Sequence, residues 1–65
     1  MITRLQELRK EKGLTQIQLA LISGVSQNQI SRFEKGQSIS DENIIKLCKA
    51  LNTSSDYFLR LTNKK

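Results

Sequence analysis

A polar residue followed three positions later by glutamine recurs in this sequence, and this spacing constrains the fold more than any other feature. It is typical of a capping box, in which two side chains satisfy backbone N–H groups at the start of a helix. The three pairs are Thr3/Gln6, Thr15/Gln18 and Ser26/Gln29. Glycine, which helix C-termini favour because it adopts left-handed conformations, follows the expected helix ends at Gly13, Gly24 and Gly36. The chain is therefore predicted to be helical.

Apolar residues on either side of the expected caps support this prediction. A hydrophobic staple joins the residue before a cap to one in the first turn, and the three candidate pairs are Leu14/Leu19, Val25/Ile30 and, around the cap Ser40, Ile39/Ile44. Together these signals predict helices over 3–12, 15–22, 26–35, 40–51 and 54–61. Short helices with short links form a compact all-α orthogonal bundle of five helices, so we expect one domain over 1–61 and a short basic tail over 62–65.

Helical periodicity, at about 100° per residue, predicts which side chains form the core. The helix over 3–12 turns Leu5 and Leu8 inward, and the last helix contributes some of its apolar residues. The apolar face of 40–51 consists of Ile44, Leu47, Cys48 and Leu51. We interpret Cys48 as a small buried core residue rather than a reactive thiol.

Composition limits what such a bundle can do. The chain has 65 residues, one cysteine and no histidine, so neither a disulfide nor a Cys/His zinc site can hold it together. Without histidine, the usual acid–base catalyst and commonest metal ligand are missing, and we expect no enzyme activity, no catalytic residue, no metal and no cofactor. No apolar run approaches the roughly 20 residues of a membrane span, and there is no signal-peptide pattern. These features predict a soluble, cytoplasmic binding protein.

The net charge of +5 favours a polyanionic partner, with nucleic acid ahead of a membrane surface. The basic residues are spread over every predicted helix. They therefore supply a general attraction and do not by themselves locate a binding site.

Two predicted helices within 16–35 are separated only by Ser23, Gly24 and Val25. A turn this short makes the helices cross steeply and touch. It needs a small side chain at the crossing, which Ala20 supplies, and a residue that tolerates positive φ, which Gly24 supplies. The second helix is held down by apolar anchors, namely Val25, Ile30 and Phe33. The segment is predicted to be two packed helices with a tight turn.

The outward face of the second helix carries amides, a hydroxyl and cations, without an acidic or apolar residue. Its members are Gln27, Asn28, Ser31, Arg32 and Lys35. Amide and guanidinium groups suit adenine and guanine edges in the major groove of DNA. An ordinary solvated face is the alternative interpretation, but such faces usually mix Glu and Lys, so the composition favours base recognition.

These residues and their surroundings resemble the Cro/CI-type helix-turn-helix regulators, the XRE family of phage repressors and their bacterial relatives. The matching motifs are Leu5-Gln6-Glu7-Leu8-Arg9, Leu14-Thr15-Gln16, Leu19-Ala20, Gly24-Val25-Ser26, Ile30-Ser31, Glu34-Lys35-Gly36, Leu51 and Ser55-Asp56-Tyr57-Phe58-Leu59. The resemblance covers nearly the whole chain without a gap. It implies a lambda-repressor-like fold and a DNA-binding transcriptional regulator.

The resemblance also implies roles for individual positions. Bases would be read by Gln27, Asn28, Gln29 and Arg32. The DNA backbone would be held, or the reading side chains braced, by Thr15, Gln16, Ser26, Ser31, Lys35, Gln37 and Ser38. Arg9 and Glu34 match an internal salt bridge of such repressors, which implies a mainly structural role for both and an additional phosphate contact for Arg9.

The sequence departs from the family at the helix over 15–22. Ile17, Leu21 and Ile22 are apolar where polar residues are common, while Ser23 replaces a usual apolar residue. We expect Ile22 to turn inward in place of Ser23. Ile17 and Leu21 would then form an apolar ridge near the DNA-facing side, serving either as local packing or as a contact with a partner protein or second subunit.

The leading hypothesis is a sequence-specific double-stranded DNA-binding repressor. It would act as a homodimer on a pseudo-palindromic operator, with helix 26–35 in the major groove. The dimer contact is expected around Tyr57, Phe58 and Leu61, and no separate small-molecule effector domain is expected. The alternative hypothesis is a protein-interaction module, such as an antitoxin that binds a partner protein through its apolar surface; an enzyme or a membrane-surface helix has weaker support.

Overall fold

Serine and threonine side chains set the start of four of the five helices in the computed structural model, which describes residues 2–64. Each N-cap side chain accepts a hydrogen bond from the backbone N–H three residues on. These caps are Thr15 for α2 (Gln16–Ser23), Ser26 for α3 (Gln27–Glu34), Ser40 for α4 (Asp41–Leu51) and Ser54 for α5 (Ser55–Phe58). Thr15 and Gln18 form the complete capping box that their spacing predicts.

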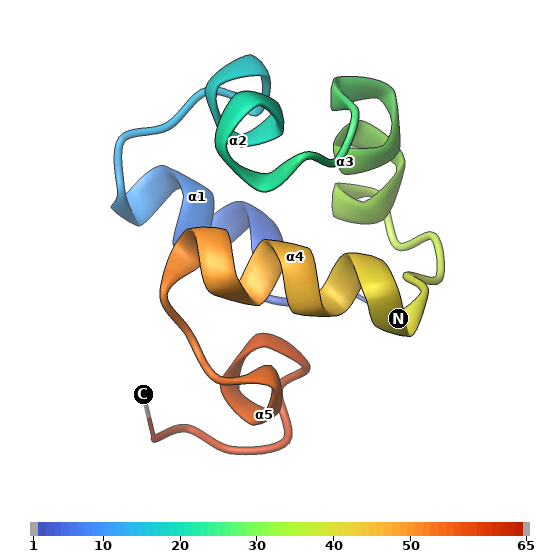
Figure 1. The fold of residues 1–65 in the computed structure, drawn as a ribbon. Helices are drawn as coiled ribbons and strands as arrows, with labels where there is room; N and C mark the ends of the chain where they lie inside the picture. Colours follow the sequence, from blue (N-terminus) through green and yellow to red (C-terminus); the bar gives the residue numbers. More distant parts are fainter. Residues whose placement is uncertain (1, 65) are drawn as a thin grey trace.

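The helices of residues 2–64 enclose one apolar core, and this range contains no strand. α4 crosses the middle of the molecule, with α1 (Leu5–Glu11) and α2 against it on one side and α5 on the other, while α3 packs on α1 and α2 (Figure 1). The buried apolar side chains are Leu5, Leu8, Leu19, Val25, Ile30, Phe33, Leu47, Cys48, Leu51 and Phe58. The predicted all-α fold is confirmed, and Cys48 lies in the core as expected. None of the helices in this range is long and apolar enough to cross a membrane.

Gly24 makes the tight turn between α2 and α3. It ends α2 in the left-handed conformation, with φ 79°, and its N–H donates to the carbonyl of Ala20 at 3.0 Å. The next N–H, that of Val25, donates to the hydroxyl of Ser23 at 3.2 Å. Two local hydrogen bonds thus carry the chain from one helix to the next, and Val25 enters the core immediately before α3.

The segment before α1 differs from the prediction. The expected capping box of Thr3 and Gln6 is wrong, because the N-cap of α1 is Arg4 and its side chain makes no capping bond. Thr3 is buried, and its hydroxyl accepts from the N–H of Leu5 at 3.2 Å. The backbone N–H of Arg4 donates instead to the carbonyl of Phe58 at 2.9 Å. A contact with the far end of the chain therefore decides where α1 begins.

α5 is shorter than the predicted helix over 54–61. The helix ends at Phe58. Beyond it, the N–H of Arg60 donates to the backbone carbonyl of Tyr57 at 3.1 Å, and the N–H of Leu61 donates to the backbone carbonyl of Asp56 at 2.8 Å. These two bonds close the helix with Arg60 in the left-handed region, at φ 63°, and this conformation prevents a further helical turn.

The same region corrects the expected dimer contact. Phe58 is fully buried in the core, so its assignment to a dimer surface is wrong. Sequence periodicity could not separate it from its neighbours in so short an apolar run. Leu61 is exposed, and Tyr57 is half-buried beneath the guanidinium of Arg4, which lies 4.1 Å from the centre of its ring.

Candidate nucleic-acid interface

α3 presents a polar outer face that two buried side chains hold in place. Ile30 and Phe33 are 0% and 3% exposed and fix the helix to the core. Four of the five polar side chains predicted on the opposite face are exposed, and Ser31 is half-buried; the four are Gln27, Asn28, Arg32 and Lys35. The face thus offers to solvent the amide and guanidinium groups that pair with adenine and guanine edges.

In the first turn of α3, the side-chain oxygen of Gln29 is hydrogen-bonded within the protein. The hydroxyl of Ser26 accepts from the backbone N–H of Gln29 and donates to its Oε1, both at 3.2 Å. The expected capping box is therefore half formed, because the Gln29 side chain meets the hydroxyl of Ser26 and not its backbone N–H. A bidentate contact with adenine uses both ends of an amide, so Gln27 and Asn28 are better suited to it than Gln29.

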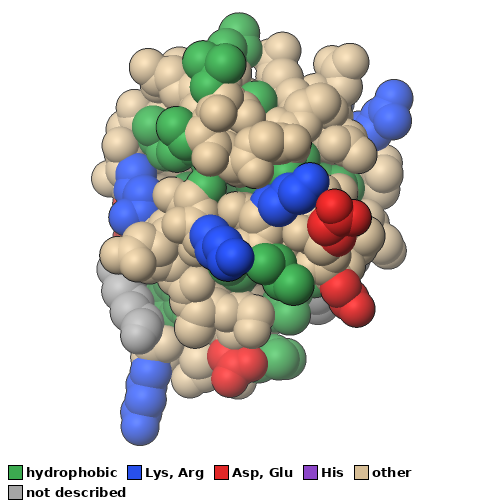
Figure 2. Space-filling view, in the orientation of Figure 1, with side chains coloured by type: hydrophobic (Ala, Val, Ile, Leu, Met, Phe, Trp, Pro, Cys, Tyr) green, Lys and Arg blue, Asp and Glu red, His purple; other side chains and the backbone are tan. Residues whose placement is uncertain are grey.

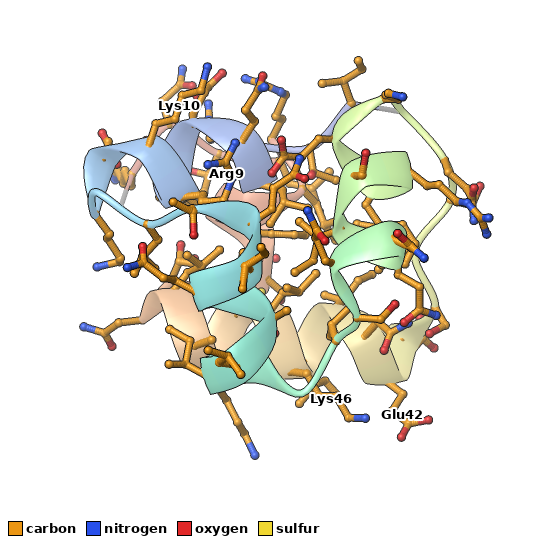
Figure 3. All side chains as sticks on the ribbon, turned by 90° about the horizontal axis from the view of Figure 1, so that it is seen from above. Arg9, Lys10, Glu42 and Lys46 are labelled. Carbon is orange, nitrogen blue, oxygen red and sulfur yellow. The ribbon has the colours of Figure 1, made fainter. Side chains whose placement is uncertain are left out.

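Arg9, Gln16 and Glu34 join three helices in one hydrogen-bond network. Arg9 donates from Nε and Nη2 to the two carboxylate oxygens of Glu34 at 2.7 and 3.1 Å. Gln16 donates from Nε2 to Glu34 Oε1 at 3.2 Å, and Figure 3 shows Arg9 pointing from α1 toward α2 and α3. The hydrogen bond with Glu34 raises the pKa of the Arg9 guanidinium. The salt bridge that the resemblance implied is present, while the contact of Gln16 with Glu34 was not foreseen.

This network places the start of α2 beside the end of α3. Gln16 is therefore bonded to the last residue of α3, directly before the C-cap Lys35. Beyond it, the N–H of Gln37 donates to the carbonyl of Arg32 at 3.1 Å, which folds the loop back onto the helix. The side chains of Lys35, Gln37 and Ser38 are exposed. The side chain of Gln16 thus reaches the end of α3, after which Lys35, Gln37 and Ser38 follow.

Comparison with known proteins identifies the architecture. The helix-turn-helix family matches residues 5–58, which is most of the chain. The chain belongs to this helix-turn-helix family. Over 51 residues it is 43% identical to antitoxin PezA of Streptococcus pneumoniae serotype 4, an alignment that covers 77% of this chain and 32% of PezA. The chain therefore spans about a third of that relative's length. The resemblance to Cro/CI-type regulators is confirmed, and the molecule is a DNA-binding helix-turn-helix domain.

The helix-turn-helix domain carries an exposed apolar patch on α2, here called the α2 patch and formed by Ile17, Leu21 and Ile22. Their exposed fractions are 57%, 80% and 58%, and Figure 2 shows hydrophobic side chains gathered at the top of the molecule, over α2. The expectation that Ile22 turns inward is wrong. Ser23 is itself half-buried, its hydroxyl accepts from the N–H of Val25, and Ile22 stays exposed.

The α2 patch continues toward the recognition helix of the helix-turn-helix domain. A shallow groove of about 510 Å³ runs from Ile17 and Leu21 past Gly24 to Ser26 and Gln27. α2 contains no charged residue, so the groove lacks a charged wall on this side. Among the residues that the structure describes, no group of three or more His, Cys, Asp or Glu side chains could hold a metal ion.

Proposed function

We propose that this DNA-binding domain is a sequence-specific transcriptional repressor that acts in the cytoplasm as a homodimer. The observation that carries the proposal is the outer face of α3, where amides and Arg32 are exposed while Ile30 and Phe33 are buried. A helix anchored in this way can enter the major groove with its polar side chains toward the base edges.

Within this proposal the polar residues divide by the part of DNA they contact. Bases are read mainly by Gln27, Asn28 and Arg32, with Gln29 contributing its Nε2 group. The sugar–phosphate backbone is held from the start of α2, from α3 and from the loop after it, by Thr15, Gln16, Ser26, Ser31, Lys35, Gln37 and Ser38. Phosphate contacts set the position of the protein, and base contacts give the sequence preference.

A dimer follows from the small number of base contacts that one recognition helix makes. Two copies on a pseudo-palindrome would read half-sites about one helical turn apart. With Phe58 buried, the proposed dimer contact is limited to the exposed Leu61 and the half-buried Tyr57.

The test of sequence-specific binding is a footprint and a gel shift on DNA upstream of the chain's own gene, repeated at several salt concentrations. We expect a protected site with two-fold symmetry. Arg32→Ala should weaken binding by on the order of 1–3 kcal/mol and relax the preference at one base pair. Equal weakening on all sequences would make Arg32 a phosphate contact only, and no protected site at any salt concentration would refute the proposal.

A second candidate function is supported by the α2 patch and by the name of the antitoxin relative. In this alternative the domain binds a partner protein through Ile17, Leu21 and Ile22. Leu21→Gln should then leave the DNA affinity within about twofold and abolish the regulatory effect in cells. If this variant regulates normally and its footprint is intact, the partner-binding function is refuted and DNA binding is the function that remains.

A further inference from the structure

Glu34 ends the recognition helix with a carboxylate that is almost wholly enclosed. Its side chain is 4% exposed, against 11% for that of Arg9. It accepts two hydrogen bonds from Arg9 and one from Gln16, and the last joins Oε1 to Nε2 at 3.2 Å. Glu34 therefore contacts the structural partner on α1 and a proposed DNA-contacting side chain on α2 at the same time.

A glutamine amide has two ends of nearly equal shape and opposite polarity. Its oxygen only accepts hydrogen bonds, and its nitrogen donates two. An ionised carboxylate also only accepts, so Glu34 can pair with Nε2 of Gln16 and not with its oxygen. The second N–H of the same nitrogen then remains for another acceptor. A phosphate oxygen is such an acceptor, and it would repel the amide oxygen if the side chain turned over.

We infer that Glu34 is a positioning residue for DNA binding, which fixes the Gln16 amide with its nitrogen available to a phosphate. The inference rests on the proposed function, in which Gln16 contacts the DNA backbone. It gives Glu34 a role beyond its salt bridge with Arg9, because Oε1 accepts from Gln16 Nε2 as well as from Arg9 Nη2, while Oε2 accepts from Arg9 Nε. Substituting Arg9 removes the salt bridge and leaves both carboxylate oxygens in place as acceptors for Gln16, whereas substituting Glu34 removes both contacts.

The test is a double-mutant cycle on the footprinted operator, measured by fluorescence anisotropy at one salt concentration. Gln16→Ala in the otherwise unchanged chain should weaken binding about tenfold, the size expected for a hydrogen bond to a charged group. In a Glu34→Gln background the same substitution should weaken it about threefold or less, since an amide at position 34 can present either a donor or an acceptor and no longer dictates which end of Gln16 faces it. In an Arg9→Gln background, where Glu34 still accepts from Gln16, the tenfold effect should return.

Equal losses on Gln16→Ala in all three backgrounds would overturn the inference and leave DNA binding intact. No loss in the unchanged chain would overturn it as well, because Gln16 would then not contact DNA. Absence of any operator complex with the unchanged chain would refute the proposed function instead.

A second measurement does not depend on DNA. In the NMR spectrum of the free protein, one of the two Nε2 protons of Gln16 should be shifted downfield and exchange slowly. This signature should persist in Arg9→Gln and weaken clearly in Glu34→Gln, because a neutral amide oxygen is a poorer acceptor than a carboxylate. If the Glu34→Gln variant does not fold, Glu34→Asp takes its place in the experiment. Aspartate keeps the negative charge, but its side chain is too short to reach Gln16. An identical Gln16 signal in all variants would overturn the inference.

Discussion

Arg60 occupies a backbone conformation that glycine would adopt more easily. At φ 63° an L-residue brings its Cβ close to the following carbonyl oxygen, which costs roughly 1–2 kcal/mol. The side chain compensates for this cost, because it donates to the carbonyls of Ile2 and Thr3 at 3.0 and 3.4 Å and pairs with Glu7 at 2.5 Å. One residue thus closes α5 and attaches it to the segment before α1.

Comparing two substitutions at this position separates the backbone from the side chain. Arg60→Ala loses the side-chain contacts and keeps the unfavourable φ, whereas Arg60→Gly loses the same contacts and removes the strain. After the greater freedom of glycine in the unfolded chain is subtracted, we expect Arg60→Ala to be the less stable by roughly 0.5–1 kcal/mol. Urea denaturation of both variants measures the difference, and an Arg60→Gly variant that is the less stable by the full entropic cost of glycine would mean that position 60 carries no strain.

Cys48 makes stability depend on pH in alkaline solution. Burial raises the pKa of its thiol above the ordinary value of 9.0, so the unfolded chain loses this proton at a lower pH than the folded chain. The stabilisation is therefore complete below about pH 9 and is lost as the pH rises toward the folded-state pKa.

The matched control for this pH dependence is Cys48→Ala, which has no thiol. At neutral pH it should be less stable by about 1 kcal/mol, the size of a small cavity. Denaturation from pH 7 to pH 10.5 should show the advantage of the unchanged chain shrinking above pH 9. An advantage that stays constant over this range would show that the thiol ionises alike in both states.

The elements of the fold differ in how far the sequence predicts them. α2, α3 and α4 begin where their caps indicate, because a serine or threonine hydroxyl and the N–H three residues on form a local pair. The start of α1 and the end of α5 were misplaced, because a hydrogen bond from Arg4 to Phe58 and a left-handed residue at Arg60 decide them. Contacts between distant parts of the chain leave no periodic pattern in the sequence.

The same distinction applies to the candidate site. The outer face of α3 follows from helical periodicity, and the pairing of Arg9 with Glu34 followed from the family resemblance. The hydrogen bond from Gln16 to Glu34 could not be predicted, because it depends on how α2 and α3 cross in three dimensions. The exposure of Ile22 also escaped prediction, because the half-buried Ser23 keeps its place in the turn by a hydrogen bond from Val25, which the sequence does not show.

The turn between α2 and α3 depends on the conformation of one residue. A Cβ added to Gly24 would meet no atom within 4 Å, and φ is +79°. Gly24→Ala should therefore destabilise the domain through backbone strain alone, by roughly 1 kcal/mol. Gly24→Asn should cost less, because asparagine tolerates the left-handed region. Thermal unfolding of the two variants tests this order, and a more stable Ala variant would contradict it.

At the scale of the whole molecule, basic residues on every side contribute to a general attraction for DNA. Only some of these cations face the DNA in the proposed complex. Each phosphate contact contributes about 0.9 to the slope of log affinity against log salt concentration. Lys35→Gln should reduce this slope by about 0.9 for each subunit bound. Lys49→Gln removes an exposed cation of the same type from α4 and should change the slope by much less. Equal changes in a salt titration would argue against a specific phosphate contact of Lys35.

The two arginines at the ends of the fold tie the beginning and the end of the chain together, which has a consequence for a load applied there. Arg4 donates to the carbonyls of Tyr57 and Thr62 and to the Asn63 side chain, at 2.8, 2.8 and 2.9 Å, while Arg60 donates to Ile2 and Thr3. A pull on the chain beyond residue 64 would reach these contacts before it reached α5 or the core. The arginine pair would then pass part of the tension directly to the segment before α1.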